Sequence, residues 1–272
     1  MKETILETKR LSRRFGSLTA VDEISFVVRR GDVFGLIGPN GAGKTTTIKM
    51  LTTLLPPTGG TAIVAGWDVV HHPANVRRTI GYVPQLLSAD GSLTGYENLL
   101  LFAKLYDLPA GEREDRIHNA IEFMGLSDAK DKLVRTYSGG MIRRLEIAQA
   151  VLHNPPVLFL DEPTVGLDPI ARQSVWKQVE ALAHNGTTII LTTHYMEEAE
   201  NLCSRIAIMY RGKFVANGSP AELKRSVPKG FSIGGNGSTL DDVFAFYSGG
   251  TLESEGGYRE TSRVRRTARR LG

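Results

Sequence analysis

The chain has 272 residues, of which 41% are hydrophobic and 23% charged, with a net charge of +4. This composition is that of a folded protein, and it excludes a mainly disordered chain and a collagen-like chain. A disulfide scaffold is excluded as well, because Cys203 is the only cysteine. Residues 258–272 hold six Arg against one Glu, a balance of +5; subtracting this from the net +4 leaves −1 for residues 1–257.

The basic character therefore belongs to a tail, and the nearly neutral body does not indicate a nucleic-acid partner. No apolar run approaches the roughly 18 residues of a membrane span. The N-terminus also lacks the long apolar region of a secretory signal. We expect a chain without a membrane span in a reducing compartment.

The first part of the chain indicates strands around a glycine-rich loop. Residues 5–35 predict short strands, with apolar residues alternating through Ile24, Phe26 and Val28. The apolar strand 33–37 ends at the glycine-rich loop, and a helix is expected from Thr45 to Leu55, before two prolines. Residues 61–86 predict further strands and loops.

Residues 92–153 change character and predict a helical insertion. Thr94 and Glu97 have the spacing of a capping box, in which the hydroxyl and the carboxylate satisfy each other's backbone N–H groups. The expected helices cover residues 98–106, 117–124 and 142–152.

From residue 157 onwards, strands and helices alternate again. Fully apolar strands separated by helices indicate a parallel sheet that is covered on both faces. The expected strands are 157–160, 187–192, 206–209 and 214–216, and the expected helices are 170–184, 196–203 and 240–247.

The strongest chemical signal is a phosphate-binding loop between the strand 33–37 and the helix that follows. The loop has two glycines separated by four residues, followed by Lys and a hydroxyl residue. This pattern lets backbone N–H groups and a helix N-terminus surround a phosphate. Lys44 would bridge the terminal phosphates and Thr45 would bind Mg²⁺. The nucleotide-binding residues expected here are Gly38, Pro39, Asn40, Gly41, Ala42, Gly43, Lys44, Thr45 and Thr46.

A partner carboxylate for Mg²⁺ is expected where the apolar strand 157–160 ends in two acids. Asp161 would face the metal, directly or through water. Glu162 would reach further and polarise the attacking water. Taken alone, these acids could equally form a solvated turn, but the phosphate loop favours the catalytic interpretation.

Four other elements are individually ambiguous. Ser138-Gly139-Gly140 could bind phosphate at a helix start or be a plain helix cap. Gln85 could be a simple exposed side chain, His194 a structural histidine, and Phe15 a core residue or a platform for a base.

Their order along the chain resolves this ambiguity. It runs Phe15, the loop 38–45, Gln85, Ser138-Gly139-Gly140, Asp161-Glu162, Gly166-Leu167-Asp168 and His194. This order resembles the ATP-binding subunit of ABC transporters over about residues 3–225. The resemblance implies an α/β fold of the P-loop NTPase type: a RecA-like mixed sheet with helices on both faces, an N-terminal antiparallel β subdomain and an α-helical insertion.

The resemblance also implies roles for the ambiguous residues. Phe15 would stack on adenine, and Gln85 would reach Mg²⁺ and sense the membrane partner. Ser138, Gly139 and Gly140 would contact the γ-phosphate bound by the opposite subunit. Asp168 would link the two sites of a dimer, and His194 would contact the γ-phosphate.

One position departs from the family's commonest signature, Leu-Ser-Gly-Gly-Gln. This chain has Tyr137 before the Ser and Met141 after the second Gly, so the hydrogen bonds of a Gln are lost at position 141. With Arg143-Arg144-Leu145-Glu146 and the C-terminal residues 238–244, this pattern resembles the daunorubicin-resistance subgroup, which exports drugs, antibiotics, lipids or polysaccharides.

The expected organisation is an ATP-binding domain over residues 1–227, with the helical insertion at about 92–153, and a C-terminal extension over 228–272. The cofactors are ATP and Mg²⁺. The partners are a separate membrane permease and a second ATP-binding subunit, identical or not, at the cytoplasmic face of the membrane. The basic tail could also contact anionic lipid.

Two alternatives stay open. An importer subunit is disfavoured by the signature, and a neighbouring gene for a solute-binding protein would favour it. A soluble ABC-type ATPase acting on nucleic acid or ribosomes would need a long coiled-coil insertion or a second cassette, and the sequence shows neither.

Overall fold

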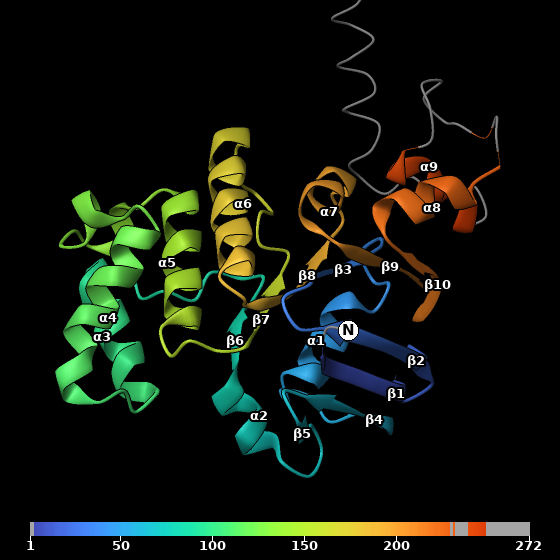
Figure 1. Ribbon diagram of the computed structural model, residues 1–272, viewed down its shortest axis with the longest axis horizontal. Coiled ribbons are helices and arrows are strands. Elements are labelled where there is room, and N and C mark those ends of the chain that lie inside the picture. Colours follow the sequence, from blue (N-terminus) through green and yellow to red (C-terminus); the bar gives the residue numbers. More distant parts are fainter. Residues whose placement is uncertain (1–2, 229–230, 232–238, 249–272) are drawn as a thin grey trace, which may run out of the picture.

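The structure is a computed structural model that describes residues 3–228, 231 and 239–248. Two β-sheets lie near the centre and one side of the molecule, and a group of helices lies on the other side (Figure 1). Among the described residues, none of the helices has the length and apolar character needed to cross a membrane.

The larger sheet has six strands in the order β10-β9-β3-β8-β7-β6. All neighbouring pairs are parallel except β9 with β10, which closes the sheet as a hairpin. This is the mixed sheet that the sequence predicted. The strands are β3 (Val33–Ile37), β6 (Ile80–Val83), β7 (Val157–Asp161), β8 (Thr188–Thr193), β9 (Arg205–Tyr210) and β10 (Lys213–Gly218).

The two faces of this sheet contribute to two apolar cores. Side chains alternate across a strand, so Val33 and Ile37 of β3 belong to one core, and Phe34 and Leu36 to the other. The first core is built with α3 (Gly95–Leu105), α4 (Ala110–Phe123), α5 (Gly139–Val151), α6 (Pro169–His184), α7 (Met196–Leu202), α8 (Pro220–Ser226) and α9 (Leu240–Tyr247). The second core is built with α1 (Lys44–Leu51), α2 (Pro73–Thr79) and the smaller sheet.

The smaller sheet is antiparallel, in the order β2-β1-β4-β5. Its strands are β1 (Thr4–Phe15), β2 (Leu18–Arg29), β4 (Gly59–Val64) and β5 (Trp67–Asp68). The prediction of short strands was wrong here, because β1 and β2 are 12 residues each. Arg10 and Glu23 have φ of 48° and 50°, and the register shifts near them interrupt the simple alternation that the sequence analysis looked for.

Residues 92–153 are mainly helical, as predicted, and the capping box of Thr94 and Glu97 at the start of α3 is confirmed. Several helix boundaries differ from the prediction: α3 and α5 each begin three residues earlier than predicted, and α1 and α4 differ more. Helix α1 ends at Leu51 and not at Leu55, because Thr53 adopts a left-handed φ of 63°. Helix α4 begins at Ala110, well before Ile117, and the short helices α2 and α8 were not predicted.

Helix α9 is confirmed at residues 240–247, and it packs on α7 and α8. Leu240, Val243 and Phe244 join the first core, and the Tyr247 hydroxyl donates to Ser226 Oγ at 3.0 Å. The predicted basic tail at 258–272 lies outside the described residues.

Candidate functional site

The phosphate loop connects β3 to α1 at the carboxyl edge of the parallel strands, as the sequence predicted. Gly38 and Gly43 have φ of 154° and 106°, a backbone conformation that side chains oppose. A Cβ on Gly38 would overlap the carbonyl oxygen of Met209, and one on Gly43 would lie 2.5 Å from the carbonyl oxygen of Ala20. The loop therefore packs so closely on the neighbouring chain that only glycine fits at these two positions.

Lys44 folds back over this loop. Its Nζ donates to the carbonyl oxygens of Gly38 at 2.8 Å and Pro39 at 3.1 Å. The same Nζ lies 3.2 Å from Oε1 of Glu162, and the two side chains are only 4% and 5% exposed. Burial lowers the pKa of the Lys44 amine, although the Glu162 carboxylate opposes this shift.

Glu162 is held between two partners. Its Oε2 accepts from Nδ1 of His194 at 2.8 Å, while its Oε1 faces Lys44. Burial alone would raise the pKa of this carboxyl, but the hydrogen bond from His194 and the positive charge of Lys44 outweigh it, so the pKa is lowered. The group is therefore ionised at neutral pH, which is the state that a general base requires.

Asp161 is bound from two sides through a single oxygen. Its Oδ1 accepts from the hydroxyls of Thr45 at 3.1 Å and Thr192 at 2.6 Å. Its Oδ2 is buried, without a hydrogen-bond partner among the described residues. Burial raises the pKa of this carboxyl, while the two hydroxyls lower it in part.

Thr192 is a site residue that the sequence analysis missed. Besides its bond to Asp161, its Oγ1 accepts from the backbone N–H of Glu162 at 3.0 Å. Asp161 and Thr192 are paired in the parallel register of β7 and β8. The available signal was that both residues stand near the carboxyl ends of predicted parallel strands, where neighbouring side chains meet.

Ser138, Gly139 and Gly140 form the start of α5. Ser138 Oγ accepts from the N–H of Met141 at 3.3 Å, so it is a helix cap in this structure. A Cβ on Gly140 would lie 2.7 Å from Cβ of Ala171, and one on Gly139 would lie 3.3 Å from Leu167. This motif therefore packs against the start of α6.

The three remaining predicted residues outside the phosphate loop lie on the surface. Asp168 caps α6, since its Oδ1 accepts from the N–H groups of Ile170 and Ala171 at 2.9 Å. Gln85 is exposed in the loop after β6. Phe15 is 45% exposed at the end of β1, with the Arg13 guanidinium 4.6 Å from its ring centre.

The structure therefore brings the side chains of five predicted residues into one network, joined through Thr192: Lys44, Thr45, Asp161, Glu162 and His194. Among the described residues, three or more His, Cys, Asp or Glu side chains do not gather into a metal site of their own. Mg²⁺ does not require such a cluster, because it usually keeps waters and phosphate oxygens beside one or two protein ligands.

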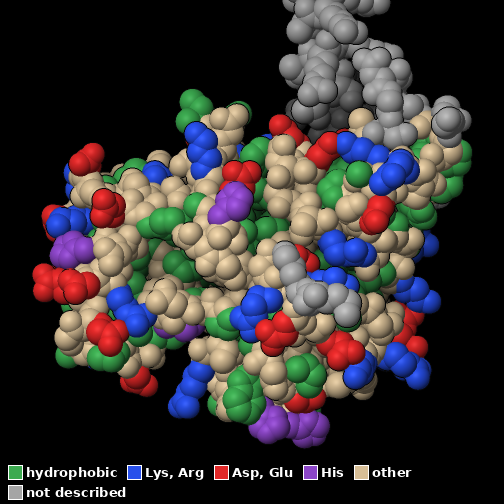
Figure 2. Space-filling model, viewed as in Figure 1, with side chains coloured by type: hydrophobic (Ala, Val, Ile, Leu, Met, Phe, Trp, Pro, Cys, Tyr) green, Lys and Arg blue, Asp and Glu red, His purple; other side chains and the backbone are tan. Residues whose placement is uncertain are grey.

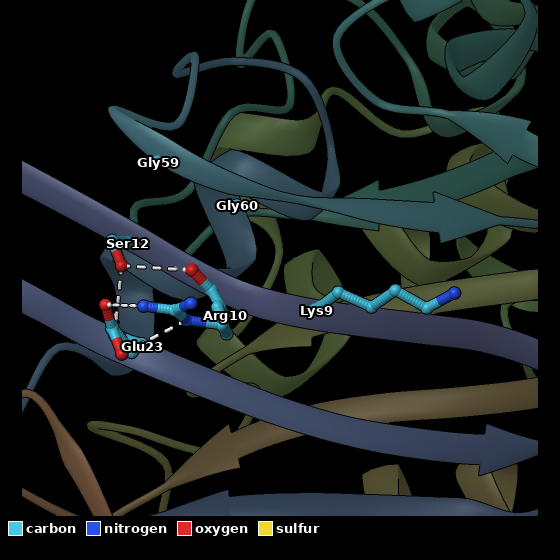
Figure 3. A pocket seen from close by; sticks show the side chains of 6 residues that line it. All are labelled: Lys9, Arg10, Ser12, Glu23, Gly59 and Gly60. Carbon is cyan, nitrogen blue, oxygen red and sulfur yellow. Dashed lines mark hydrogen bonds and ion pairs between the residues drawn. The ribbon is translucent and has the colours of Figure 1, made fainter.

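A separate hollow of about 370 Å³ lies on the antiparallel sheet (Figure 3). Its polar lining includes Arg10 and Glu23, which form an exposed ion pair at 2.7 Å. Their backbones have positive φ, and Ser12 Oγ bridges the two strands by accepting from the N–H of Glu23 at 3.0 Å. The hollow contains none of the predicted site residues, and we interpret it as the surface of the bulged strands.

Acidic and basic side chains are interspersed over the face of the molecule shown in Figure 2, and neither sign forms a continuous patch there. The described residues on this face therefore form no single-sign surface of the kind that steers a highly charged macromolecule.

Comparison with known proteins gives a consistent family. Residues 21–165 match a family described as ABC transporter. The chain is 48% identical over 222 residues to the daunorubicin/doxorubicin resistance ATP-binding protein DrrA of Streptomyces peucetius, covering 82% of this chain and 67% of that protein. It is 45% identical over 219 residues to the Nod factor export ATP-binding protein I of Ralstonia nicotianae, covering 80% and 68% of the two chains.

A solved ATP-binding subunit of an ABC transporter has the same fold. It superposes with a TM-score of 0.77 at 31% sequence identity, over 90% of this chain and 100% of that one. The predicted fold class is therefore confirmed.

Proposed function

The chain belongs to the ABC transporter family, as an ATP-binding subunit with ATPase activity, and we propose that it drives export through a separate membrane permease. The names of its relatives support this direction: one refers to drug resistance and another to export. The transported class would be drugs, antibiotics, lipids or polysaccharides. We further propose residues 1–227 as the ATP-binding unit, with 92–153 as its helical insertion and 228–272 as its extension.

The observation that carries the proposed mechanism is the buried network around Glu162. Lys44 would exchange Glu162 and the loop carbonyls for the terminal phosphates of ATP. Glu162 would then be free to orient and polarise the attacking water, and His194, 2.8 Å from it, would contact the γ-phosphate. The backbone of residues 38–46 would surround the phosphates.

The residues present also fit Mg²⁺. Thr45 Oγ1 and Asp161 supply the hard oxygen ligands that this ion prefers, and the unpartnered Oδ2 of Asp161 is an oxygen ready to accept it or its water. Gln85 would add a ligand from its loop. The ion would neutralise the negative charge of the phosphates when it is bound.

The signature motif supports a composite site made by two subunits. Ser138 and Gly139 are exposed, and the motif packs on α6 while Lys44 is occupied by the phosphate loop and Glu162. We propose that Ser138, Gly139 and Gly140 contact ATP bound to a second copy or a related subunit, with Asp168 close to the junction. Closure would bury the phosphates and exclude water other than the nucleophile.

The adenine base of ATP and the membrane are the two remaining contacts that we propose. The exposed ring of Phe15 would stack on adenine. The permease would hold the chain at the cytoplasmic face of the membrane. The tail 258–272 would add up to roughly 1 kcal/mol per arginine where it approaches anionic lipid. Liposome binding that is unchanged after deletion of residues 258–272 would remove the lipid contact.

Co-purification with the permease tests the whole proposal. The tagged full chain is isolated from detergent-solubilised membranes, and the complex is reconstituted in vesicles with ATP outside. We expect a bound multispanning protein and ATP-dependent movement of substrate into the vesicle lumen, which corresponds to export from a cell. Transport that moves the other way and requires a solute-binding protein would instead establish the importer.

A further inference from the structure

A buried ion pair on helix α5 faces the loop that carries Gln85. Arg143 Nη1 lies 3.0 Å from Oε2 of Glu146, and the side chains are 3% and 2% exposed. Moving two charges from water into the protein interior costs several kcal/mol per ion. Their mutual attraction offsets this cost only when their remaining polar atoms are also hydrogen-bonded. The additional partners of the pair therefore indicate its role.

Arg143 binds the first part of this loop. Its Nη1 donates to the carbonyl oxygen of Pro84 at 2.7 Å, and its Nη2 donates to that of Gln85 at 2.8 Å. Residues 84–90 form neither helix nor strand, so these two carbonyls are not satisfied by a regular backbone pattern. The planar guanidinium suits such double contacts, which a lysine amine could not reproduce.

Glu146 binds the second part of the same loop. Its Oε1 accepts from the backbone N–H of Ser88, from Ser88 Oγ at 3.2 Å and from the N–H of Ala89 at 3.3 Å. The pair thus matches each charge to the correct backbone group, with the cation on the carbonyls and the anion on the amides. We call these contacts of Arg143 and Glu146 with residues 84–89 the loop clasp.

The loop clasp holds the Gln85 loop against helix α5, which also carries the signature motif. Helix α5 begins with the signature residues Gly139 and Gly140, and the clasp lies on the turns that follow. A movement of α5 would therefore displace the backbone of Gln85 together with the signature motif. The loop is also held at Asp90, whose N–H donates to Asn98 Oδ1 of α3 at 2.9 Å.

We propose that Arg143 and Glu146 are positioning residues that fix the Gln85 loop to the signature helix. Gln85 would serve the site of its own chain and the signature motif that of the partner, so the clasp couples the two sites. This inference rests on the proposed function for the roles of Gln85 and Ser138. The pair acts through the loop and does not itself touch ATP.

Arg144 provides a matched control on the same helix. Its Nη1 donates to the carbonyl oxygens of Met124 at 2.7 Å and Gly125 at 3.2 Å. It is therefore also an arginine with two backbone acceptors, but both acceptors lie inside the helical insertion. Arg144→Gln removes a comparable set of bonds without releasing the Gln85 loop.

The first experiment measures the mobility of the Gln85 loop. Leu86 is 82% exposed, and the natural Cys203 is buried at 6%, so Leu86→Cys gives one accessible position for a nitroxide spin label. We expect Arg143→Gln and Glu146→Met, which removes the acceptor oxygens, to increase the mobility of the label in the full chain, and Arg144→Gln to leave it unchanged. Equal mobility in all of these variants would overturn the clasp.

The second experiment measures how the loss of these contacts changes the rate of ATP turnover. Arg143→Gln is expected to lower kcat for ATP about 10- to 100-fold, the range that misplacement of a catalytic group produces. If Arg143 acts through Gln85, adding Arg143→Gln to Gln85→Ala causes little further loss, because the double-mutant cycle is not additive. Full additivity of the two losses would contradict coupling through Gln85.

A charge exchange separates the clasp from a simple ion pair. Arg143→Glu with Glu146→Arg retains both charges, but glutamate cannot donate to carbonyls and arginine cannot accept from amides. We expect a mobile label and low kcat, and recovery of wild-type values would overturn the clasp. The label could be mobile in Arg143→Gln while kcat is unchanged both in that variant and in Gln85→Ala. This result would support the loop clasp and refute the proposed role of Gln85.

Discussion

Nζ of Lys44 lies 3.2 Å from Oε1 of Glu162, and each of these side chains is at least 95% buried. The lysine amine has three N–H donors, and its three acceptors here are two loop carbonyls and this carboxylate. In the proposed mechanism, ATP therefore competes with Glu162 for Lys44. The same exchange would release the carboxylate toward the water, which links phosphate binding to activation of the base.

The first prediction follows from this competition. Glu162→Gln should bind ATP at least as tightly as the wild type, because a neutral amide attracts the lysine less. Turnover should fall about 10²- to 10⁴-fold, the usual contribution of a general base. With hydrolysis stopped, the ATP-bound dimer should accumulate. Nucleotide titration, phosphate release and sedimentation of the full chain measure these three quantities.

Glu122→Gln is the control for this change, because Glu122 is an exposed residue of α4. It should leave binding, turnover and association as in the wild type. A Glu162→Gln protein that hydrolyses ATP at the wild-type rate would remove Glu162 from the mechanism. One that stays monomeric in saturating ATP would contradict the composite site.

A second prediction concerns Lys44 itself. Lys44→Ala should lose nearly all ATP turnover, because it removes the cation on the terminal phosphates. It should also destabilise the fold by about 3–5 kcal/mol, because the buried Glu162 carboxylate loses its cation and keeps only His194 as a partner. Combining it with Glu162→Gln should restore much of the stability but no turnover. Denaturant unfolding beside the ATPase assay separates the two effects, and a near-normal rate in Lys44→Ala would refute the phosphate-loop assignment.

A third prediction uses the opposite pKa shifts of two aspartates. Burial raises the pKa of Asp161, so its folded-state ionisation opposes stability. The penalty is absent below the ordinary pKa of 3.8, grows as the pH rises, and is fully present above the folded-state pKa. Asp161→Asn should therefore be more stable than the wild type at pH 7, with the difference disappearing toward pH 4. Urea unfolding without nucleotide, repeated from pH 4 to 8, measures it.

Asp68→Asn is the matched control and should have the opposite sign. Although burial raises its pKa, hydrogen bonds from the Thr61 hydroxyl and from the N–H groups of His71 and Val70 lower it to about 2. Its ionisation thus contributes about 2 kcal/mol above pH 4, and this contribution is lost as the pH falls toward 2. If both variants shift stability in the same direction at pH 7, the assignment of opposite electrostatic environments is wrong.

Local patterns made much of the fold and site predictable. The apolar runs of β3 and β7 each end in chemistry-bearing residues, and the loop around Lys44 is encoded within eight consecutive residues. Asp161 and Glu162 follow directly from the second run. These features depend on neighbours in the sequence, so a single sequence is sufficient to find them.

The missed features depend on contacts between distant segments. Thr192 joins the site only because the parallel register places it beside Asp161. Arg143 and Glu146 could be recognised as part of a subgroup pattern, but their partners lie more than fifty residues away in the chain. The lengths of β1 and β2 were missed because positive φ at Arg10 and Glu23 breaks the two-residue period.

A fourth prediction separates two roles of Gly140: packing against α6 and contact with the nucleotide of the partner. A Cβ on Gly140 would lie 2.7 Å from Cβ of Ala171, so Gly140→Ala should cost about 1–3 kcal/mol of stability through overpacking. Adding Ala171→Gly should recover most of that stability. If Gly140 also approaches the nucleotide of the partner, ATPase activity should stay low in the double variant. Recovery of both stability and activity would limit Gly140 to packing against α6.

The last prediction concerns the tyrosine that precedes the signature. The Tyr137 hydroxyl donates to the carbonyl oxygen of Ala129 at 2.6 Å, and the ring is 8% exposed. A Cβ on Gly95 would overlap this hydroxyl. Gly95 at the start of α3 therefore leaves the space that the hydroxyl of Tyr137 fills, and the two positions should respond to mutation as a pair.

Tyr137→Phe should lose about 0.5–1.5 kcal/mol, because the buried carbonyl of Ala129 loses this donor and keeps only the N–H of Lys132. Gly95→Ala should be similarly destabilising in the wild type, since the hydroxyl has no room to move without breaking that bond. In the Tyr137→Phe background the clash is gone, so Gly95→Ala should cost little more. Denaturant unfolding of the four proteins gives the coupling energy. Additive losses would show that the hydroxyl and Gly95 do not share this space, and the departure from Leu at position 137 would then need another explanation.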